Sequence, residues 1–240
     1  MERLGRDQLD FARRFDELST ANLADGCMRA GVPVRCTHMS MRPIEAGGRL
    51  AGRVLPARHA GSVDIFLEAF SRAQAGDVLV VDNAGRVDEA CVGDLVVLEA
   101  QAADLAGIVI WGLHRDTADI RAIGLPVFSL GSSPTGPASQ RPRWPDALTR
   151  ACVEDLTVTS DDVIFADDDG VIAVPAAHAD EVISIARAIR ETEAGQADLI
   201  KAGMSLRSQL RFDEYLRRRE QNPELGFRDH LRTVGGAVEE

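Results

Sequence analysis

The stretch VGDLVVLEAQAADLAGIVIWGLHRDTADIRAIGLPVFSL, residues 92–130, decides the expected fold. Its apolar spacing predicts a helix that ends at Gly107, the buried strand IVIW, a short helix closed by Gly124, and the strand PVFSL. The stretch GDVLVVDNAG (76–85) before it reads as a strand followed by a turn. The resulting order β-α-β-α-β is typical of an α/β layer. The turn before the first helix lacks the glycine-rich pattern of a Rossmann dinucleotide site.

Regular patterns continue on both sides of this unit. RLAGRVLPAR (49–58) alternates like a strand, and VIFADDDGVIAVP (163–175) predicts a hairpin that turns at Asp-Gly. A long amphipathic helix is expected over 178–203, with Val182, Ile185, Ala186 and Ile189 on one side. The Pro/Ser/Gly-rich segment 132–145 predicts a loop.

The two ends of the chain are expected to be helical. Near the N-terminus, Ser19 or Thr20 is a plausible cap for a short helix that stops at Gly31. We therefore expect an N-terminal helical arm over 1–17, one α/β domain over 18–205, and an Arg-rich C-terminal helical arm over 206–240 that serves oligomer contacts.

The bulk composition excludes several function classes. The chain has 240 residues, 45% of them hydrophobic, and a formal net charge of −11. This acidity argues against a nucleic-acid partner, which requires clustered positive charge. No apolar run is long enough to span a membrane, and the N-terminus has no signal-peptide core. Because the four cysteines are widely spaced, without a CxxC motif, we expect a reducing cytoplasmic location.

The basic residues and histidines narrow the chemistry further. Lys201 is the only lysine, and it lies in a polar helical stretch, whereas Schiff-base chemistry needs a desolvated or cation-perturbed lysine. The five histidines have no HxH, HxxxH or HExxH spacing, which argues against a zinc site. Any metal is therefore expected to be a hard divalent cation bound by carboxylates and water.

Three charged residues form the candidate site. Asp94 opens the expected helix, and Arg115 and Asp116 follow the strand beside it, so all three lie at the edge of the layer where α/β folds bind ligands. The backbone amides of Leu95 and Val96 would be free at the helix N-terminus to bind a carboxylate. Arg115 can bind the same anion or an enolate, and Asp116 can hold a divalent cation.

Each of these residues also has a structural interpretation. Asp94 after Gly93 can be an N-cap, Asp116 can be a second cap, and Arg115 with Asp116 can form a surface ion pair. His114 is interpreted as a bystander rather than a proton donor, and Cys91 has no histidine partner that would make it a catalytic thiol.

Two loop motifs admit similar alternatives. DDDG (167–170) is more typical of a turn than of a metal site, and SSPTGP (132–137) is more typical of a rigid interface loop than of a phosphate loop.

The segment that begins at GDLVVLEAQ and ends at SSPTGP resembles the core of the RraA-like family, which includes class II 4-hydroxy-4-methyl-2-oxoglutarate aldolases and the RraA proteins that inhibit ribonuclease E. The similarity extends over residues 18–205 through STANLADGCMRAG, GDVLVVDNAG and DDDGVIAVP. Aldolase members share an Asp, a twenty-residue gap and then Arg-Asp, which this chain has in full. The resemblance implies a swivelling β/β/α sandwich that assembles into a homotrimer or a multiple of three, with sites between subunits.

The resemblance also implies a role for each site residue. Asp116 would bind Mg²⁺ or Mn²⁺, and Arg115 would bind the pyruvyl carboxylate or keto oxygen. Asp94 would orient a water as acid/base, and the amides of Leu95 and Val96 would complete the carboxylate site. A neighbouring subunit's long helix would supply a metal-ligating glutamate, best matched here by Glu193 and next by Glu191. The C-terminal segment FDEYLRRREQNPELGFRDHL does not match the aldolase tail, so the natural substrate can differ.

The first functional hypothesis is a divalent-metal-dependent lyase that cleaves a small 2-oxo acid and releases pyruvate, with oxaloacetate decarboxylation as a side reaction through the same enolate. A non-catalytic regulator that binds ribonuclease E is an alternative from another class. A metal-dependent decarboxylase or hydratase of a sugar-derived 2-oxo acid is a third, and the sequence does not separate it from the first.

Overall fold

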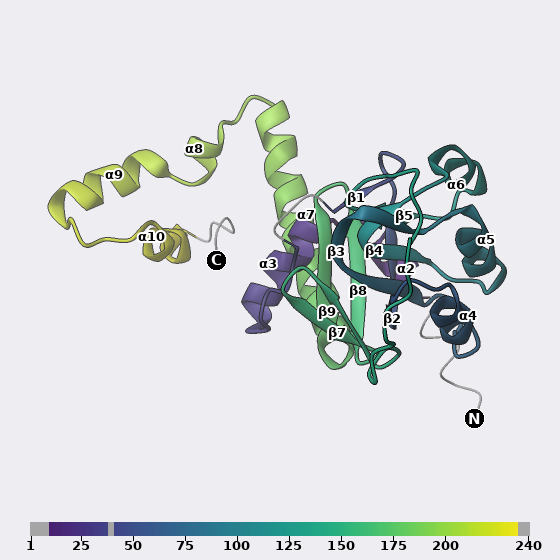
Figure 1. Cartoon of the computed structure of the whole chain (residues 1–240). Coiled ribbons are helices and arrows are strands. Elements are labelled where there is room, and N and C mark those ends of the chain that lie inside the picture. Colours follow the sequence, from purple (N-terminus) through teal and green to yellow (C-terminus); the bar gives the residue numbers. More distant parts are fainter. Residues whose placement is uncertain (1–9, 38–40, 235–240) are drawn as a thin grey trace.

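A computed structural model describes residues 10–37 and 41–234 and contains one curled sheet of seven strands (Figure 1). Its strand order is β1-β5-β4-β3-β2-β8-β9, and the central strands β2, β3, β4 and β5 are parallel. A separate hairpin is formed by β6 and β7. The strands are β1 Arg42–Pro43, β2 Leu50–Arg58, β3 Val78–Val92, β4 Gly107–His114, β5 Val127–Ser129, β6 Arg150–Val153, β7 Leu156–Thr159, β8 Asp162–Asp167 and β9 Gly170–Pro175.

The helices pack on the sheet in two groups, and Figure 1 shows α4, α5 and α6 on one side of it and α3 and α7 on the other. One apolar core joins α4, α5 and α6 to the parallel strands, and a second joins α2, α3 and α7 to β8 and β9. The helices of the body are α2 Asp10–Phe15, α3 Thr20–Ala30, α4 Asp64–Phe70, α5 Asp94–Ala102, α6 Thr117–Ile123 and α7 Ala179–Lys201. A third core lies between the β6–β7 hairpin and the sheet. Hairpin, sheet and helices form a single β/β/α domain, which confirms the expected fold class.

Several local predictions are confirmed. Ser19 caps α3 in a reciprocal capping box with Asn22, and Gly31 ends that helix in the left-handed conformation. Gly124 ends α6 in the same way, and β8 and β9 form the expected hairpin. On α7 the apolar side is as expected except that Ile183 is buried and Ile185 only partly so.

Other expectations were wrong. The turn expected in 76–85 does not end the strand, because β3 continues to Val92 through register shifts beside Ala84 and Gly85, both at positive φ. The helix expected over 92–107 ends at Ala102, and Gly107 already belongs to β4. The β6–β7 hairpin and the helix α4 were not predicted.

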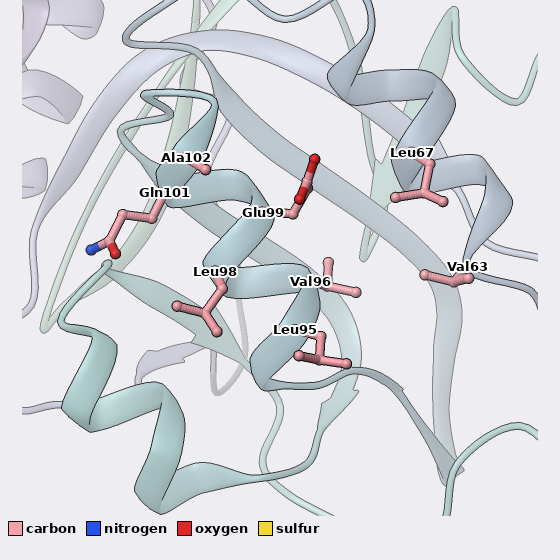
Figure 2. Close-up of a pocket in the computed structure, with 8 residues that line it drawn as sticks. All are labelled: Val63, Leu67, Leu95, Val96, Leu98, Glu99, Gln101 and Ala102. Atoms are coloured by element: carbon pink, nitrogen blue, oxygen red, sulfur yellow. The ribbon is translucent and has the colours of Figure 1, made fainter.

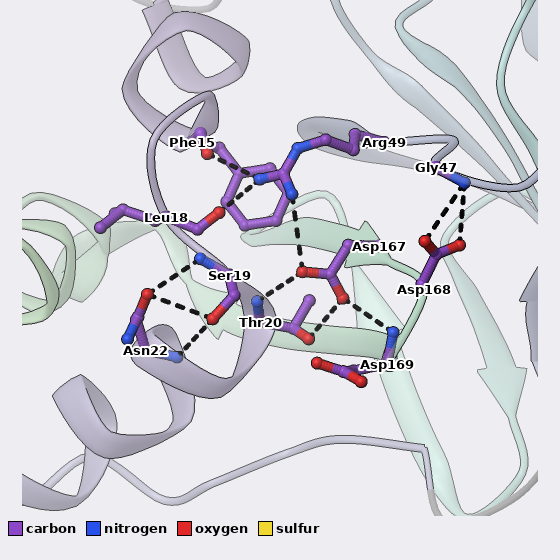
Figure 3. Close-up of polar contacts among 10 residues, drawn as sticks. All are labelled: Phe15, Leu18, Ser19, Thr20, Asn22, Gly47, Arg49, Asp167, Asp168 and Asp169. Carbon is purple, nitrogen blue, oxygen red and sulfur yellow. Dashed lines mark hydrogen bonds and ion pairs between the residues drawn. The ribbon is translucent and has the colours of Figure 1, made fainter. Parts of the chain in front are cut away.

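The carboxylate of Asp167 joins the N-terminal helices to the β8–β9 hairpin (Figure 3). It accepts hydrogen bonds from the Thr20 amide at 2.8 Å and the Thr20 hydroxyl at 2.7 Å, at the start of α3. Arg49 lies over the Phe15 ring at 4.2 Å and donates to the carbonyl oxygens of Phe15 and Leu18. The first Asp of DDDG thus caps a helix, while the motif forms a hairpin turn as expected.

The helical segments at the two ends differ in their packing. Phe11 and Phe15 of α2 are buried against Phe165 of the sheet, so this segment lies within the core of the domain. The C-terminal helices α8 Leu206–Gln209, α9 Phe212–Gln221 and α10 Phe227–Val234 extend away from the body (Figure 1). Residues 1–9 and 235–240 of the expected arms lie outside the described residues.

Candidate functional site

The carboxyl ends of the parallel strands bring the candidate residues to one edge of the sheet. Arg115 follows β4, and its amide donates to the Val92 carbonyl oxygen at 2.9 Å, which joins it to the end of β3. Asp94 begins α5 two residues after β3. This is the edge at which open α/β sheets bind ligands.

The structure corrects the capping interpretation of Asp94. Gly93, not Asp94, is the N-cap of α5, and it makes no side-chain cap hydrogen bond. The Asp94 carboxylate has no hydrogen-bond or ion-pair partner within the described part of the chain. The Val97 amide donates to the Gly93 carbonyl oxygen. The amides of Leu95 and Val96 come before it in the helix, so no carbonyl oxygen of the helix accepts from them. The first turn of α5 therefore presents unpaired donors together with an uncommitted carboxylate.

Asp116 is held in an unusual backbone conformation. It is the N-cap residue of α6 at φ 59° and ψ 41°, and its side chain makes no cap hydrogen bond. Its Oδ2 lies 3.3 Å from the Arg115 Nε, and both side chains are substantially exposed. A Cβ atom built on Gly93 would lie 2.5 Å from that same Oδ2. The carboxylate therefore sits directly against the N-terminus of α5, in space that only a glycine leaves open.

Arg115 also faces the loop that follows β5. A Cβ atom on Gly136 would lie 2.8 Å from the Arg115 Nη1, and the Ala90 amide of β3 donates to the Thr135 carbonyl oxygen at 2.7 Å. The SSPTGP loop is thus fastened to the sheet beside the guanidinium group. Its close approach limits the orientations that the Arg115 side chain can take.

A cavity of about 320 Å³ collects most of these residues. Its size falls in the range of small-molecule sites. The predicted residues Asp94, Leu95, Val96 and Arg115 line it, together with residues to which the sequence assigned no role in the site: His59, Gly61–Val63, Ala90, Cys91, Gly93 and Pro137. His59 directly follows β2, so the rule that parallel strands end at one edge could have found it.

Burial disfavours the charged forms of two side chains near this edge, His114 and Cys91. His114 Nδ1 lies 2.8 Å from the Ser129 hydroxyl and Nε2 lies 3.0 Å from the Thr117 hydroxyl, so both ring nitrogens are occupied. Burial lowers the pKa of His114, which favours the neutral ring. This agrees with the interpretation of His114 as a bystander that fixes the start of α6. Burial likewise raises the pKa of the Cys91 thiol well above its usual range, which disfavours a thiolate nucleophile.

Glu193 does not join this cavity within one chain. It lies on α7, which packs with α3 on the other core, and its Oε2 accepts a hydrogen bond from Asn22 Nδ2 at 3.2 Å. Among the described residues, no group of three His, Cys, Asp or Glu side chains is arranged to hold a metal. Lys201 is exposed and paired with Asp198 at 3.0 Å, as expected for a surface lysine.

An apolar groove lies beside the candidate site, between α4 and α5 (Figure 2). Its volume is about 770 Å³, and Val63 and Leu67 lie opposite Leu95 and Val96 across it. Leu95 is 74% exposed and Leu67 is 54% exposed. Leu95 and Val96 line both the groove and the smaller cavity, so the two adjoin each other.

No helix in the described ranges is both long enough and apolar enough to cross a lipid bilayer.

Comparison with known proteins identifies a family and a relative to which this chain is similar. The family model described as RraA-like, Aldolase/RraA, matches residues 20–173. Protein DlpA of Legionella pneumophila subsp. pneumophila is 29% identical over 176 residues, which cover 70% of this chain but 28% of DlpA. The chain thus spans little more than a quarter of the length of that relative.

Solved structures share the fold. An uncharacterized protein from Pseudomonas syringae pv. tomato matches with a TM-score of 0.70 at 23% identity, covering 82% of this chain and 95% of that one. Streptomyces coelicolor RraAS2, described as an unusual member of the RNase ES inhibitor RraA protein family, gives 0.67 at 25% identity over 77% and 94% of the two chains. The RNA-processing inhibitor RraA from Thermus thermophilis gives 0.57 at 25% identity over 65% and 92%.

Proposed function

This chain belongs to the RraA-like family, and from that premise we propose that it is a divalent-metal-dependent carbon–carbon lyase. The reaction would cleave a 2-oxo acid of the 4-hydroxy-4-methyl-2-oxoglutarate type at the carbon–carbon bond beta to its 2-oxo carbonyl, between C3 and the hydroxyl-bearing C4, and release pyruvate. Oxaloacetate would lose CO₂ in a side reaction, because both reactions pass through the pyruvate enolate. The observation that carries the proposal is the shared cavity of Asp94, Arg115 and the first turn of α5, with Asp116 at its rim.

The roles of the residues follow from their chemistry. The amides of Leu95 and Val96 would bind the substrate carboxylate at the positive end of α5. Arg115 would stabilise the negative charge that develops on the enolate oxygen, an interaction that is stronger in the transition state than in the substrate. Asp94, which has no competing partner, would orient a water that protonates the enolate carbon.

The residues present fit Mg²⁺ or Mn²⁺. Asp116 offers hard carboxylate oxygens, and Mg²⁺ commonly binds through one or two carboxylates while keeping several waters, one of which Asp94 would orient. A metal bound through Asp116 would act as a Lewis acid on the 2-oxo group. Asp116 is already placed by its backbone and by Gly93 rather than by a cap hydrogen bond, so its carboxylate is available for this purpose.

Assembly would complete the site. A homotrimer, or a multiple of three, would cover the apolar groove between α4 and α5 and bring Glu193 of one subunit, or Glu191, toward Asp116 of the next. Support comes from the exposed leucines of this groove, which adjoins the cavity at Leu95, since an exposed apolar patch of this kind marks an interaction surface.

The direct test is incubation of the purified protein with Mg²⁺ and a panel of 2-oxo acids, with pyruvate detected by a coupled assay. We expect release from a 4-hydroxy-2-oxo diacid and from oxaloacetate. The same panel separates the related candidate, a decarboxylase or hydratase of a sugar-derived 2-oxo acid, which would consume such an acid without releasing pyruvate. Absence of turnover across the panel would contradict all enzymatic assignments.

A second candidate function is regulation of ribonuclease E without chemistry. It is favoured by the 25% identity to RraAS2 and to the Thermus RraA, whose names describe inhibitors. An acidic chain suits docking to basic, RNA-binding surfaces. Inhibition of purified ribonuclease E by a variant that lacks Arg115 would support this function, because a pure binder has no need of that site.

A further inference from the structure

His59 is a buried histidine with one ring nitrogen left free at the candidate site. Its ring stacks on Phe66 with centroids 5.4 Å apart and planes inclined by 6°, and its Nδ1 lies 2.9 Å from Asn83 Oδ1. Nε2 has no partner among the described residues, and it is not fully enclosed by protein atoms, so a ligand can reach it. Since His59 also lines the 320 Å³ cavity, this nitrogen is the polar atom that the ring can offer to a ligand there.

The hydrogen bonds of Asn83 fix the protonation of this ring. Arg141 donates to the same Asn83 Oδ1 at 3.4 Å, and a guanidinium group can only donate, so the amide oxygen faces both partners. An amide oxygen can only accept, so the proton of the neutral ring is on Nδ1. Nε2 then carries the lone pair and is a hydrogen-bond acceptor, held in one orientation by Phe66 and Asn83.

The charged groups around His59 allow its neutral ring to accept a proton during a reaction. Burial lowers the pKa of His59, so the ring is neutral near pH 7; the Asn83 hydrogen bond and the carboxylates of Glu89 and Asp64 oppose this effect, whereas Arg86 adds to it. Glu89 is itself buried and is held by Arg141 at 3.1 Å and by Arg86 at 3.2 Å. A neutral ring that charges next to a fixed carboxylate has the properties of a general base.

A purely structural role explains this arrangement less well. His114, at the same edge of the sheet, has hydroxyl partners on both ring nitrogens. His59 has a partner on one nitrogen and an opening on the other. Nε2 instead opens to the cavity, so it is positioned to bond whatever occupies that cavity.

We infer that His59 is a catalytic residue that accepts the proton of the substrate hydroxyl group at Nε2; this rests on the proposed lyase function. The hydroxyl proton passes to Nε2, and the O–H electron pair forms the new carbonyl. The carbon–carbon bond breaks, and its electrons become the enolate of pyruvate beside Arg115. A water proton converts the enolate to pyruvate, and the imidazolium returns its proton to the resulting hydroxide. The substrate class is therefore a 2-oxo acid with a hydroxyl group on the carbon that leaves.

Two reactions of one protein test this role. Cleavage of 4-hydroxy-4-methyl-2-oxoglutarate needs removal of a hydroxyl proton, whereas oxaloacetate decarboxylation forms the same enolate without one. His59→Phe keeps a ring against Phe66, and His59→Gln keeps a polar group near Asn83, but neither has the base. We expect each to reduce kcat for cleavage by roughly 10²–10⁴-fold, the usual contribution of a general base, and to change decarboxylation by about threefold at most. His114→Asn, the matched control, should leave the ratio of the two rates unchanged.

The wild-type protein provides a readout that does not depend on variant folding. The ratio of cleavage to decarboxylation should rise with pH as His59 loses its proton and then become constant. Equal losses of both reactions in the His59 variants, or a ratio that does not change with pH, would overturn the role of His59 alone. A wild-type protein inactive on both substrates would overturn the lyase function, and the role of His59 with it.

Discussion

At the scale of single residues, the conformation of Asp116 is the feature that best separates a binding site from a surface ion pair. A non-glycine residue in the left-handed region costs on the order of 1 kcal/mol, although Asp tolerates it better than most residues. The φ of 59° at Asp116 is not compensated by a cap hydrogen bond. Its carboxylate instead occupies the space beside the missing side chain of Gly93. The local strain thus holds a carboxylate where a cation and an enolate would meet.

Gly93→Ala should therefore reproduce the effect of Asp116→Asn. The new methyl group would displace the Asp116 carboxylate, and the Mg²⁺ concentration for half-maximal activity should rise by about tenfold or more, as for other changes next to a metal ligand. Excess Mn²⁺ should recover part of the rate. Asp119→Asn, an exposed carboxylate on the same helix, is the control and should behave like wild type. An unchanged Mg²⁺ dependence in Gly93→Ala would show that Asp116 is not a ligand.

Arg115 should affect the rate rather than the metal affinity. Removal of its charge in Arg115→Ala should reduce kcat by roughly 10²–10³-fold, as for other preorganised groups that stabilise a developing anion. Arg115→Lys should recover little, because an ammonium group lacks the planar two-donor geometry. Steady-state kinetics with oxaloacetate measures kcat for both variants. If Arg115 only forms the exposed pair with Asp116, both variants will retain most of the activity.

At the scale of elements, prediction from sequence succeeded where a short-range rule decides the structure. Ser19, Gly31 and Gly124 mark helix ends by local hydrogen bonding and left-handed backbone, and all three are observed. The turn expected within 76–85 does not end the strand, because the pairing of β3 with β4 continues beyond it to Val92 and His114. Such long-range pairing overrides a local turn preference.

The same distinction applies to the candidate site. The spacing of Asp94, Arg115 and Asp116 in the sequence, combined with the strand-edge rule, predicted that they lie together. The hydrogen bond between His59 and Asn83 was not predictable from the sequence. It depends on the irregular backbone at Ala84 and on the loop that brings Arg141 to the Asn83 side chain. Tertiary contacts of that kind leave no periodic pattern in the sequence.

The junction of α3 with the β8–β9 hairpin gives a prediction about stability. Asp167→Ala would leave the buried Thr20 amide and hydroxyl without their acceptor, so the free energy of unfolding should fall by about 2–4 kcal/mol. Asp168→Ala, which removes an exposed acceptor for the Gly47 amide, should cost about 1 kcal/mol or less. Urea denaturation measures both, and equal effects would contradict the assigned role of Asp167.

At the scale of the whole molecule, the surface is divided into an acidic body and an Arg-rich arm. Seven arginines lie between residues 206 and 234, in a chain whose net charge is −11. Within the arm, Tyr215 contacts Phe227 at 5.0 Å and Leu231 is buried, so α9 and α10 share a small core. The arm and the groove between α4 and α5 are the two surfaces that we expect subunit contacts to use.

Light scattering should therefore give a trimer or a multiple of three at micromolar concentration. Leu98→Glu places a charge in the apolar groove, and we expect it to shift the protein toward smaller species. Glu99→Gln, in the same groove, is the control and should assemble like wild type. A monomeric wild-type protein would rule out a site shared between subunits.

The central claim is that this site releases pyruvate with the aid of a divalent metal, and a metal-removal assay tests it most directly. Pyruvate release from 4-hydroxy-4-methyl-2-oxoglutarate should stop when EDTA is added and return when Mg²⁺ or Mn²⁺ is restored in excess, because the carboxylate ligands bind these hard cations reversibly. Arg115→Ala, run in parallel, should remain slow throughout. Full activity of the wild-type protein in EDTA would contradict the account.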